Sequence, residues 1–338
     1  MKSKQISLAL QGGGAHGAFT WGVLDYLLEQ EDVDIRAITA TSAGAMNAVA
    51  LASGMVAGGR MGAREALSDF WSDVSQRGAP MAAANAITPA FGPFTPFAMF
   101  QALTNVASPY DLNPFDYNPL QQTLRKTIDF EGIRTHSDLK IFIAATNVET
   151  GKVRIFKTEE LTENSVLASA CLPQVFKAVK VDNTPLWDGG YVGNPSLFPL
   201  FYSDVPRDML IVHINPMQRK GVPKTATAIL DRLNEITFNA SLVSELRSIA
   251  FVQKLLDENW LADRIKSKYR RLFVHAIRAD KQLSSFSIES KFETSWRFLT
   301  DLKSRGRDAA ESWYHENFDK VGKSSSVDIK AEFLDALD

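Results

Sequence analysis

A glycine-rich segment near the start of the chain has the composition of an anion-binding loop. Residues 11–17 read QGGGAHG. Consecutive glycines allow backbone conformations that other residues avoid, and they let a ligand approach the backbone amides closely. The segment precedes a helical pattern, and negative charge is favoured near a helix N-terminus. Gly12, Gly13 and Gly14 are therefore candidates to bind a phosphate, or the oxyanion of an acyl-transfer intermediate.

Ser42 is the candidate nucleophile. It stands between Thr41 and Ala43, after an expected strand and before an expected helix, with Ala40 and Gly44 on either side. A tight strand-to-helix turn exposes a serine hydroxyl at the positive end of the helix and accepts only small neighbours. Such a serine is often a plain helix cap. The glycine-rich segment one crossover upstream favours the nucleophile, because adjacent parallel strands bring both loops to one sheet edge.

The glycines also fit a dinucleotide-binding fold. Gly12, Gly14 and Gly17 match the spacing G-x-G-x-x-G, which is a weak signal when taken alone. A dinucleotide fold also places an acidic residue near the end of the second strand, where it binds the ribose hydroxyl. The chain has Ser42 there and no carboxylate. The sequence therefore favours acyl transfer over nucleotide binding.

Asp188 is the candidate base. It is followed by Gly189 and Gly190, a pattern that on its own is typical of a turn. In combination with Ser42, Asp188 supplies the base that a serine nucleophile needs. A carboxylate on a constrained loop could accept the hydroxyl proton. We therefore expect a Ser42–Asp188 dyad.

A serine–histidine–aspartate triad is the alternative, because α/β-hydrolases also place the nucleophile on such a turn and follow the order serine, acid, histidine. Three histidines come after the candidate acid: His213, His275 and His315. The first two stand in strand-like apolar runs, as structural histidines do, and His315 lies in a charged helical pattern. His136 precedes the acid and does not fit this order. The sequence favours the dyad.

Together these motifs resemble the patatin-like phospholipase family. Its members combine a glycine-rich oxyanion loop, a G-x-S-x-G turn and a D-G-[GA] aspartate, and the same order occurs here over residues 6–194. Residues 169–173, SACLP, also resemble the segment that precedes the family's aspartate. The resemblance implies that Ser42 attacks an ester carbonyl, that Asp188 takes its proton, and that the glycine amides bind the oxyanion. It further implies phospholipid or other fatty-acyl ester substrates, and chemistry that needs no metal or cofactor.

Two positions depart from the family pattern. Ala40 stands where the family's turn usually begins with glycine, and its methyl group is tolerated if the backbone stays in the β region. His16 stands where many members carry arginine or lysine. A histidine is only partly charged near neutral pH. We therefore expect His16 to modulate activity, and any support that it gives to an anionic headgroup to weaken as the pH rises.

Strand and helix patterns alternate along the first fifty residues. Residues 6–10 and 34–40 read as buried strands, and residues 17–29 and 43–53 as helices. This order is typical of a parallel sheet with crossover helices. With the resemblance, it predicts an α/β fold of three layers, α/β/α, with a mostly parallel central sheet and the nucleophile on a strand-to-helix turn.

The chain divides into two expected regions: a catalytic domain over residues 1–220, and a mainly helical region over residues 221–338 packed on the same domain. Further strand patterns cover residues 139–146, 209–215 and 272–277, and long helical patterns cover residues 225–264 and 290–316. No motif that we recognise falls after about residue 225.

Residues 78–118 are apolar but interrupted by proline. Pro80, Pro89, Pro93 and Pro96 alternate there with phenylalanines, which argues against a long stable helix. The segment is either an irregular loop packed on the core or an apolar lid that contacts a membrane surface transiently, because exposed aromatic residues suit a boundary between water and lipid.

Composition sets further limits. The 338 residues include 37 basic and 39 acidic ones, and this balance gives no electrostatic case for nucleic-acid binding. Cys171 is the only cysteine, so no intrachain disulfide forms, and free cysteines are usually buried and inert. We see no signal peptide, and no apolar run reaches the length of a membrane span. We therefore expect a cytoplasmic protein that can associate peripherally with a membrane.

We predict a lipid acyl hydrolase of the phospholipase A type that works through an acyl-enzyme on Ser42. Two alternatives remain open. One is a carboxylesterase or acyltransferase acting on other esters, because a serine–aspartate dyad does not fix the acyl acceptor. The other is a non-catalytic lipid-binding protein, because a scaffold can keep its motifs without turnover.

Overall fold

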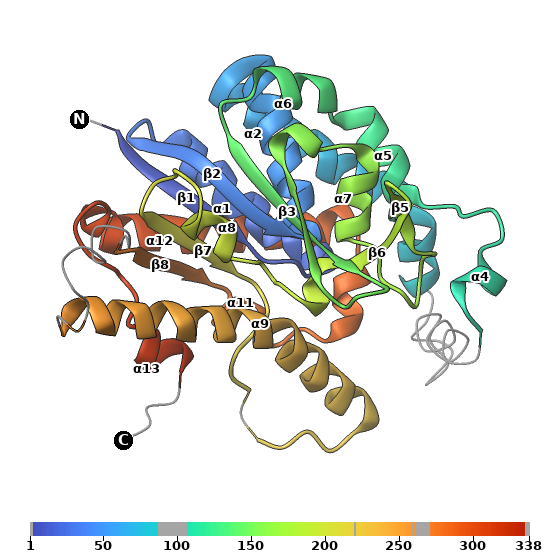
Figure 1. The fold of residues 1–338 in the computed structure, drawn as a ribbon. Helices are drawn as coiled ribbons and strands as arrows, with labels where there is room; N and C mark the ends of the chain where they lie inside the picture. Colours follow the sequence, from blue (N-terminus) through green and yellow to red (C-terminus); the bar gives the residue numbers. More distant parts are fainter. Residues whose placement is uncertain (1–2, 87–106, 220, 259, 261–270, 335–338) are drawn as a thin grey trace.

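An eight-stranded, mostly parallel sheet lies at the centre of the computed structural model, which describes residues 3–86, 107–219, 221–258, 260 and 271–334 (Figure 1). The strands are β1 (Lys4–Leu10), β2 (Val33–Thr41), β3 (Lys140–Asn147), β4 (Val153–Lys157), β5 (Val179–Val181), β6 (Thr184–Asp188), β7 (Asp208–His213) and β8 (Phe273–Arg278). Their order is β5-β6-β3-β2-β1-β7-β8, and β4 also pairs with β3. Strands β3, β2, β1, β7 and β8 are parallel, while β4, β5 and β6 form antiparallel pairs.

Helices cover both faces of this sheet. The longer ones are α1 (Gly17–Glu29), α2 (Ala43–Ala86), α9 (Ala226–Asp257) and α12 (Trp296–Asn317). The shorter ones are η1 (Gly14–His16), α4 (Pro109–Leu112), α5 (Pro119–Thr127), α6 (Phe130–His136), η3 (Thr158–Glu160), α7 (Glu163–Ser169), η4 (Gly189–Tyr191), α8 (Phe198–Phe201), α11 (Asp280–Leu283), η5 (Ile288–Phe292), η6 (Phe318–Lys320) and α13 (Ile329–Phe333). The predicted three-layer α/β fold is confirmed.

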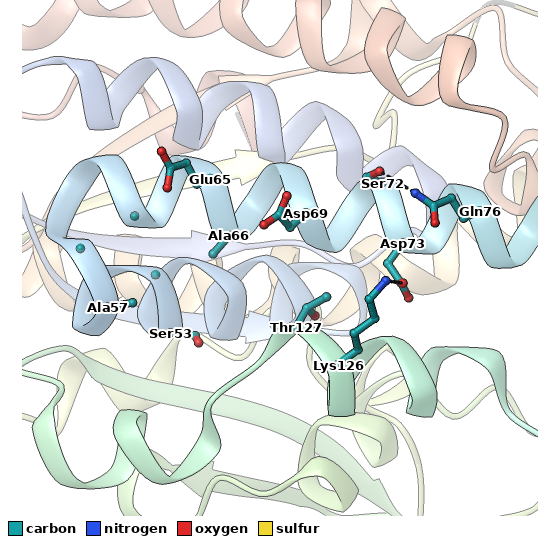
Figure 2. A pocket seen from close by; sticks show the side chains of 13 residues that line it. Ser53, Ala57, Glu65, Ala66, Asp69, Ser72, Asp73, Gln76, Lys126 and Thr127 are labelled. Carbon is teal, nitrogen blue, oxygen red and sulfur yellow. Dashed lines mark hydrogen bonds and ion pairs between the residues drawn. The ribbon is translucent and has the colours of Figure 1, made fainter.

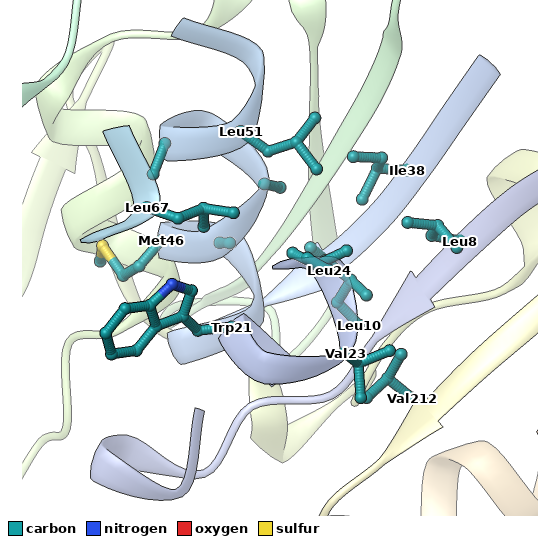
Figure 3. Close-up of a cluster of buried hydrophobic side chains, with 14 of the residues drawn as sticks. Leu8, Leu10, Trp21, Val23, Leu24, Ile38, Met46, Leu51, Leu67 and Val212 are labelled. Carbon is teal, nitrogen blue, oxygen red and sulfur yellow. The ribbon is translucent and has the colours of Figure 1, made fainter. Parts of the chain in front are cut away.

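The core has two parts because successive side chains of a strand point to opposite faces. Leu8 and Leu10 of β1 pack in one cluster with α1 and α2, whereas Ala9 packs in the other with α8, α9 and α13. Figure 3 shows the first cluster, in which strand residues meet Trp21 and Leu24 of α1 and Met46 of α2. This packing fixes α1 and α2 against the sheet, and each of these helices begins at a candidate site segment.

Helix α2 is longer than the sequence suggested. The helix expected over residues 43–53 continues past Gly54, and a kink with non-helical backbone angles follows at Gly58 and Gly59. A Cβ added to Gly54 would lie 2.3 Å from the carbonyl oxygen of Gly62. Gly54 therefore does not end the helix. It allows the two segments of α2 to pack closely.

The chain after residue 220 contributes to the same sheet and to its helical layers. β8 pairs in parallel with β7, so the strand expected over residues 272–277 is confirmed. α12 packs along α1. The helix expected to begin at residue 290 begins at Trp296 instead, because η5 precedes it and lines a cavity described below.

Part of the proline-interrupted segment, residues 87–106, lies outside the described residues, so the predicted lid stays a prediction. α2 continues past Pro80 and ends at Ala86. Beyond the gap, the side chains of Tyr110, Phe115 and Tyr117 are exposed. No helix within the described residues combines the length and apolar character needed to cross a bilayer.

Candidate active site

The glycine-rich segment and Ser42 meet at one edge of the sheet. Leu10 and Ala40 are register partners in the parallel pair β1–β2, so the loops that follow these strands lie side by side. A Cβ added to Gly12 would lie 2.6 Å from the Cβ of Ser42. The structure thus brings together two segments that the sequence placed on separate loops.

Ser42 lies on a strained turn between β2 and α2. Its φ is 53°, a left-handed conformation that residues other than glycine rarely adopt and that is concentrated at functional sites. Its N–H donates to Ser169 Oγ at 2.8 Å, and its carbonyl accepts from the Met46 N–H at 3.1 Å. The turn is therefore held from the α7 side and by the first turn of α2.

Ala40 lies within β2 and not on the turn. It pairs with Leu10 on one side and Ile143 on the other, so its backbone is extended. An alanine there requires no unusual φ. The close approach occurs instead at Gly44, where an added Cβ would lie 2.3 Å from the Leu10 carbonyl oxygen.

The glycine-rich loop is anchored by two asparagines. The Gly12 N–H donates to Asn194 Oδ1 at 2.7 Å, and the Gly12 carbonyl accepts from Asn215 Nδ2 at 2.8 Å. Gly13 and Gly14, by contrast, line the cavity that contains Ser42. The backbone of Gly12 therefore holds the loop in place, while the next two glycines face the space where a substrate would lie.

Asp188 is the last residue of strand β6, and hydrogen bonds to other segments fix its backbone. Its N–H donates to the Cys171 carbonyl at 2.8 Å, and its carbonyl accepts from Thr146 Oγ1 at 2.7 Å. The carboxylate Oδ1 accepts from the Gly190 N–H at 2.7 Å. Among the described residues, its Oδ2 has no hydrogen-bond partner. One carboxylate oxygen thus fixes the side chain and the other is left to accept a proton.

Burial raises the pKa of Asp188 to about 6. The Gly190 N–H, the Ser42 side chain and the positive charge of Lys291 oppose this rise. A general base works best when its pKa lies near the operating pH. Asp188 is therefore ionised at neutral pH, yet it binds a proton far more readily than an exposed aspartate.

Ser42 and Asp188 line one cavity of about 310 Å3. Its walls are largely apolar and include Phe70, Trp71, Leu120, Leu172, Phe176 and Phe238. Lys291 is the only basic side chain among the described residues that line it. Lys291 belongs to no sequence motif and lies far from Ser42 along the chain, so no pattern in the sequence points to it.

His16 is not the partly charged residue that we expected. Its side chain is 3% exposed, and it packs near Phe286 and Phe298 with ring centroids 5.9 and 6.4 Å away. Its Nε2 lies 2.7 Å from Ser290 Oγ. Burial, with the nearby charges of Lys291 and Arg219, lowers its pKa to about 3. His16 is therefore neutral at physiological pH and cannot supply a cation to the loop.

The histidines considered for a triad have other partners. His213 Nε2 lies 3.1 Å from Asn239 Oδ1, and His275 Nε2 lies 3.1 Å from Asp208 Oδ1. His315 is exposed on α12. None of the three lines the cavity that contains Ser42. These positions agree with a dyad.

Cys171 is buried, and burial raises its pKa to about 12, so its thiol stays neutral. Its side chain plays no part in the cavity lining, although its carbonyl holds Asp188. Within the part of the chain that the structure describes, no group of three or more histidine, cysteine, aspartate or glutamate residues could hold a metal ion.

A second cavity, of about 490 Å3, lies between the two segments of α2 and the end of α5 (Figure 2). Asp69, Asp73 and Lys126 line it, and Lys126 Nζ pairs with Asp73 Oδ1 at 2.7 Å. Ser72 also lines it, but it lies within helix α2 and not on a strained turn such as that of Ser42. The first cavity is therefore the candidate active site.

No curated protein matches the chain. Among solved structures, the chain is similar to VipD from Legionella pneumophila, at 14% identity and a TM-score of 0.36 over 98% of this chain and 73% of that one. It is also similar to ExoU in the ExoU–SpcU complex from the type III secretion system of Pseudomonas aeruginosa, at 17% identity and a TM-score of 0.36 over 92% of this chain and 52% of that one.

The chain thus spans about half the length of ExoU, and these distant likenesses carry no conclusion about its activity. The family comparison is stronger. The patatin-like phospholipase model matches residues 8–201, a span that contains the glycine-rich loop, Ser42 and Asp188. The chain therefore belongs to the patatin-like phospholipase family.

Proposed function

We propose that this protein is a serine acyl hydrolase of the phospholipase A type, with Ser42 as the nucleophile and Asp188 as the general base. The family supports a lipid acyl hydrolase. The observation that carries the residue assignment is the shared cavity, in which a strained serine, a carboxylate with a free oxygen and a glycine-rich loop face the same apolar space.

In the first step, Ser42 Oγ attacks the ester carbonyl and Asp188 Oδ2 takes the hydroxyl proton. The oxyanion that forms is stabilised by the backbone N–H groups of Gly13 and Gly14, next to η1. Gly12 supports this loop through Asn194 and does not donate to the oxyanion, because its N–H is already engaged. Of the three predicted glycines, we therefore propose Gly13 and Gly14 as the oxyanion donors and Gly12 as an anchor of the loop.

The intermediate then collapses. Asp188 gives its proton to the leaving alcohol, and Ser42 keeps the acyl group as an ester. In the second half of the reaction, Asp188 takes a proton from water, the resulting hydroxide attacks the acyl-enzyme, and the fatty acid leaves. The proton returns to Ser42 Oγ, so the enzyme ends as it began.

The cavity favours a substrate with a long apolar group. Aromatic and aliphatic side chains such as Phe70, Trp71 and Leu172 line it, and they would bury the acyl chain. We further propose that residues 78–118 contact the membrane transiently. The exposed Tyr110, Phe115 and Tyr117 support this proposal, because aromatic side chains favour the interface between water and lipid.

The test is active-site labelling followed by product analysis. A fluorophosphonate probe should label the wild type and not Ser42→Ala. Mass spectrometry of a mixed lipid panel should then show release of fatty acid from phospholipid by the wild type, and a loss of more than about a thousandfold in Ser42→Ala and Asp188→Asn.

Matched controls come from the second cavity. Ser72→Ala and Asp69→Asn change the same residue types on α2 and should leave labelling and hydrolysis intact. Hydrolysis by Ser42→Ala at the wild-type rate would contradict the mechanism. Labelling without phospholipid hydrolysis, together with turnover of simple esters, would identify a carboxylesterase instead.

A further inference from the structure

Lys291 places a positive charge in the wall of the candidate active site. It belongs to η5, in the part of the chain beyond the family match. Its Nζ donates to Asn215 Oδ1 and to Asn234 Oδ1, each at 2.8 Å, and lies 5.2 Å from the centroid of the Phe238 ring. An ammonium group has three N–H donors. Neutral amide oxygens accept two of these N–H groups. The third N–H group is available for another acceptor.

No described carboxylate forms an ion pair with Lys291. The charges of three nearby carboxylates, Glu235, Asp231 and Asp188, favour its protonated form, and Glu235 is itself paired with Arg219 at 2.6 Å and with Arg232 at 3.2 Å. A buried ammonium without a paired anion is costly, and burial lowers the pKa of Lys291 to about 8. The ammonium group of Lys291 is therefore still protonated at neutral pH. An anion that entered the cavity would offset the free-energy cost of burying this charge, and that would favour its binding.

The position of Lys291 is tied to the catalytic loop. Asn215 binds Lys291 Nζ through its Oδ1 and the Gly12 carbonyl through its Nδ2. The backbone of Lys291 also packs on Gly14, where an added Cβ would lie 2.4 Å from the Lys291 carbonyl oxygen. The ammonium is thus held at a fixed place relative to the glycines and to Ser42, which line the same cavity.

We propose that Lys291 binds the phosphate of the substrate and so directs the enzyme to acyl esters that carry a phosphate close to the scissile bond. This inference rests on the proposed acyl hydrolase function. The cavity offers apolar walls for an acyl chain and one cation for an anionic group. A glycerophospholipid carries both groups, because its phosphate is attached to the glycerol that bears the esters. His16 cannot supply this charge, because it is neutral and buried.

The experiment compares two substrates with the same acylated glycerol, of which only one carries a phosphodiester headgroup. The full-length protein is assayed on phosphatidylcholine and on diacylglycerol with the same acyl chains, both in the same detergent micelles. In Lys291→Gln, the ratio of kcat/KM for phosphatidylcholine to that for diacylglycerol should fall about tenfold or more, mainly through KM for phosphatidylcholine. Lys291→Arg should restore part of the ratio. Lys281→Gln, which changes an exposed lysine of α11, should leave the ratio as in the wild type.

Each result separates the two proposals. An equal loss on both substrates in Lys291→Gln would overturn the phosphate assignment, because it would show that the lysine acts on the oxyanion or on the fold. Wild-type protein that hydrolyses neither substrate would refute the proposed function itself. Glycerol 3-phosphate provides a measurement that needs no variant. It should inhibit diacylglycerol hydrolysis by the wild type competitively, and an absence of inhibition would also overturn the inference.

Discussion

The buried carboxylate of Asp188 makes a quantitative prediction about pH. Hydrolysis needs this group ionised, and its pKa is about 6. On an uncharged, water-soluble ester, kcat/KM should follow the ionised fraction, which is about nine-tenths at pH 7, one half at pH 6 and about one-tenth at pH 5. A carboxyl group with the ordinary pKa of 3.8 would still be more than about nine-tenths ionised at pH 5. The fall from pH 7 to pH 5 is therefore about tenfold with burial and nearly absent without it.

The other groups near the carboxylate do not change charge over this interval. Lys291, with a pKa of about 8, stays protonated. Cys171, with a pKa of about 12, and Tyr191, whose pKa burial raises, both stay neutral. His16, with a pKa of about 3, also stays neutral. Asp188 is the group in the site whose titration should govern the acid side of the profile.

The assay measures kcat/KM on a short-chain ester from pH 5 to pH 7, with the products quantified after quenching so that detection does not depend on pH. Circular dichroism at pH 5 checks that the protein is folded. Lys291→Gln removes a charge that lowers the pKa of Asp188, so the acid limb of this variant should move to higher pH. A flat profile in a protein that remains folded at pH 5 would refute the assignment of Asp188 as a buried base.

Three further substitutions test other parts of the site and its support. Gly12→Ala would place a Cβ 2.6 Å from that of Ser42 and should lower kcat by about a hundredfold, whereas Gly58→Ala, where nothing lies within 4 Å, should not. Ser169→Ala removes the acceptor of the Ser42 N–H and should lower the free energy of unfolding by about 1–3 kcal/mol, measured by urea denaturation; an unchanged midpoint would contradict it. Glu245 accepts two backbone N–H groups at the start of α8, and burial raises its pKa from 4.5 to about 7. The raised pKa means that its contribution to stability is present below pH 4.5 and is lost as the pH rises towards 7. Glu245→Gln should remove this part of the pH dependence in urea unfolding at a series of pH values, and an identical dependence in both proteins would argue against it.

Much of the site's frame could be predicted from the sequence because its requirements are local. A glycine run after an apolar strand, and small residues around Ser42, indicate tight turns whatever the rest of the chain does. The helix expected over residues 17–29 has those bounds in the structure. Asp188 was harder to interpret. Its glycines suggested a turn, whereas the residues before it form β6, a strand that depends on pairing with β3.

The remainder of the site depends on contacts between distant parts of the chain. His16 was expected to be partly charged near neutral pH, because nothing in the sequence around it shows that Phe286 and Phe298 cover it. The side chain of Asn215 binds Gly12 of the glycine loop, and Lys291 binds Asn215 in turn. Single side-chain contacts of this kind produce no periodic pattern or motif in the sequence. A long, charged side chain in a helical stretch is most simply interpreted as solvated, and only the packed structure shows otherwise.

The order of the strands also limits how this protein can be shortened. The family match ends at residue 201, and β7 and β8 follow it. A fragment that stopped there would leave one side of β1 unpaired, although residues 6–10 are fully buried. A fragment that kept β7 but stopped before β8 would instead expose the unpaired edge of β7, a strand whose six residues are all buried. Exposed apolar strand edges recruit other chains, so both fragments should aggregate. The shortest useful expression fragment must include β8, and it must extend through α12 to keep the helix that packs along α1.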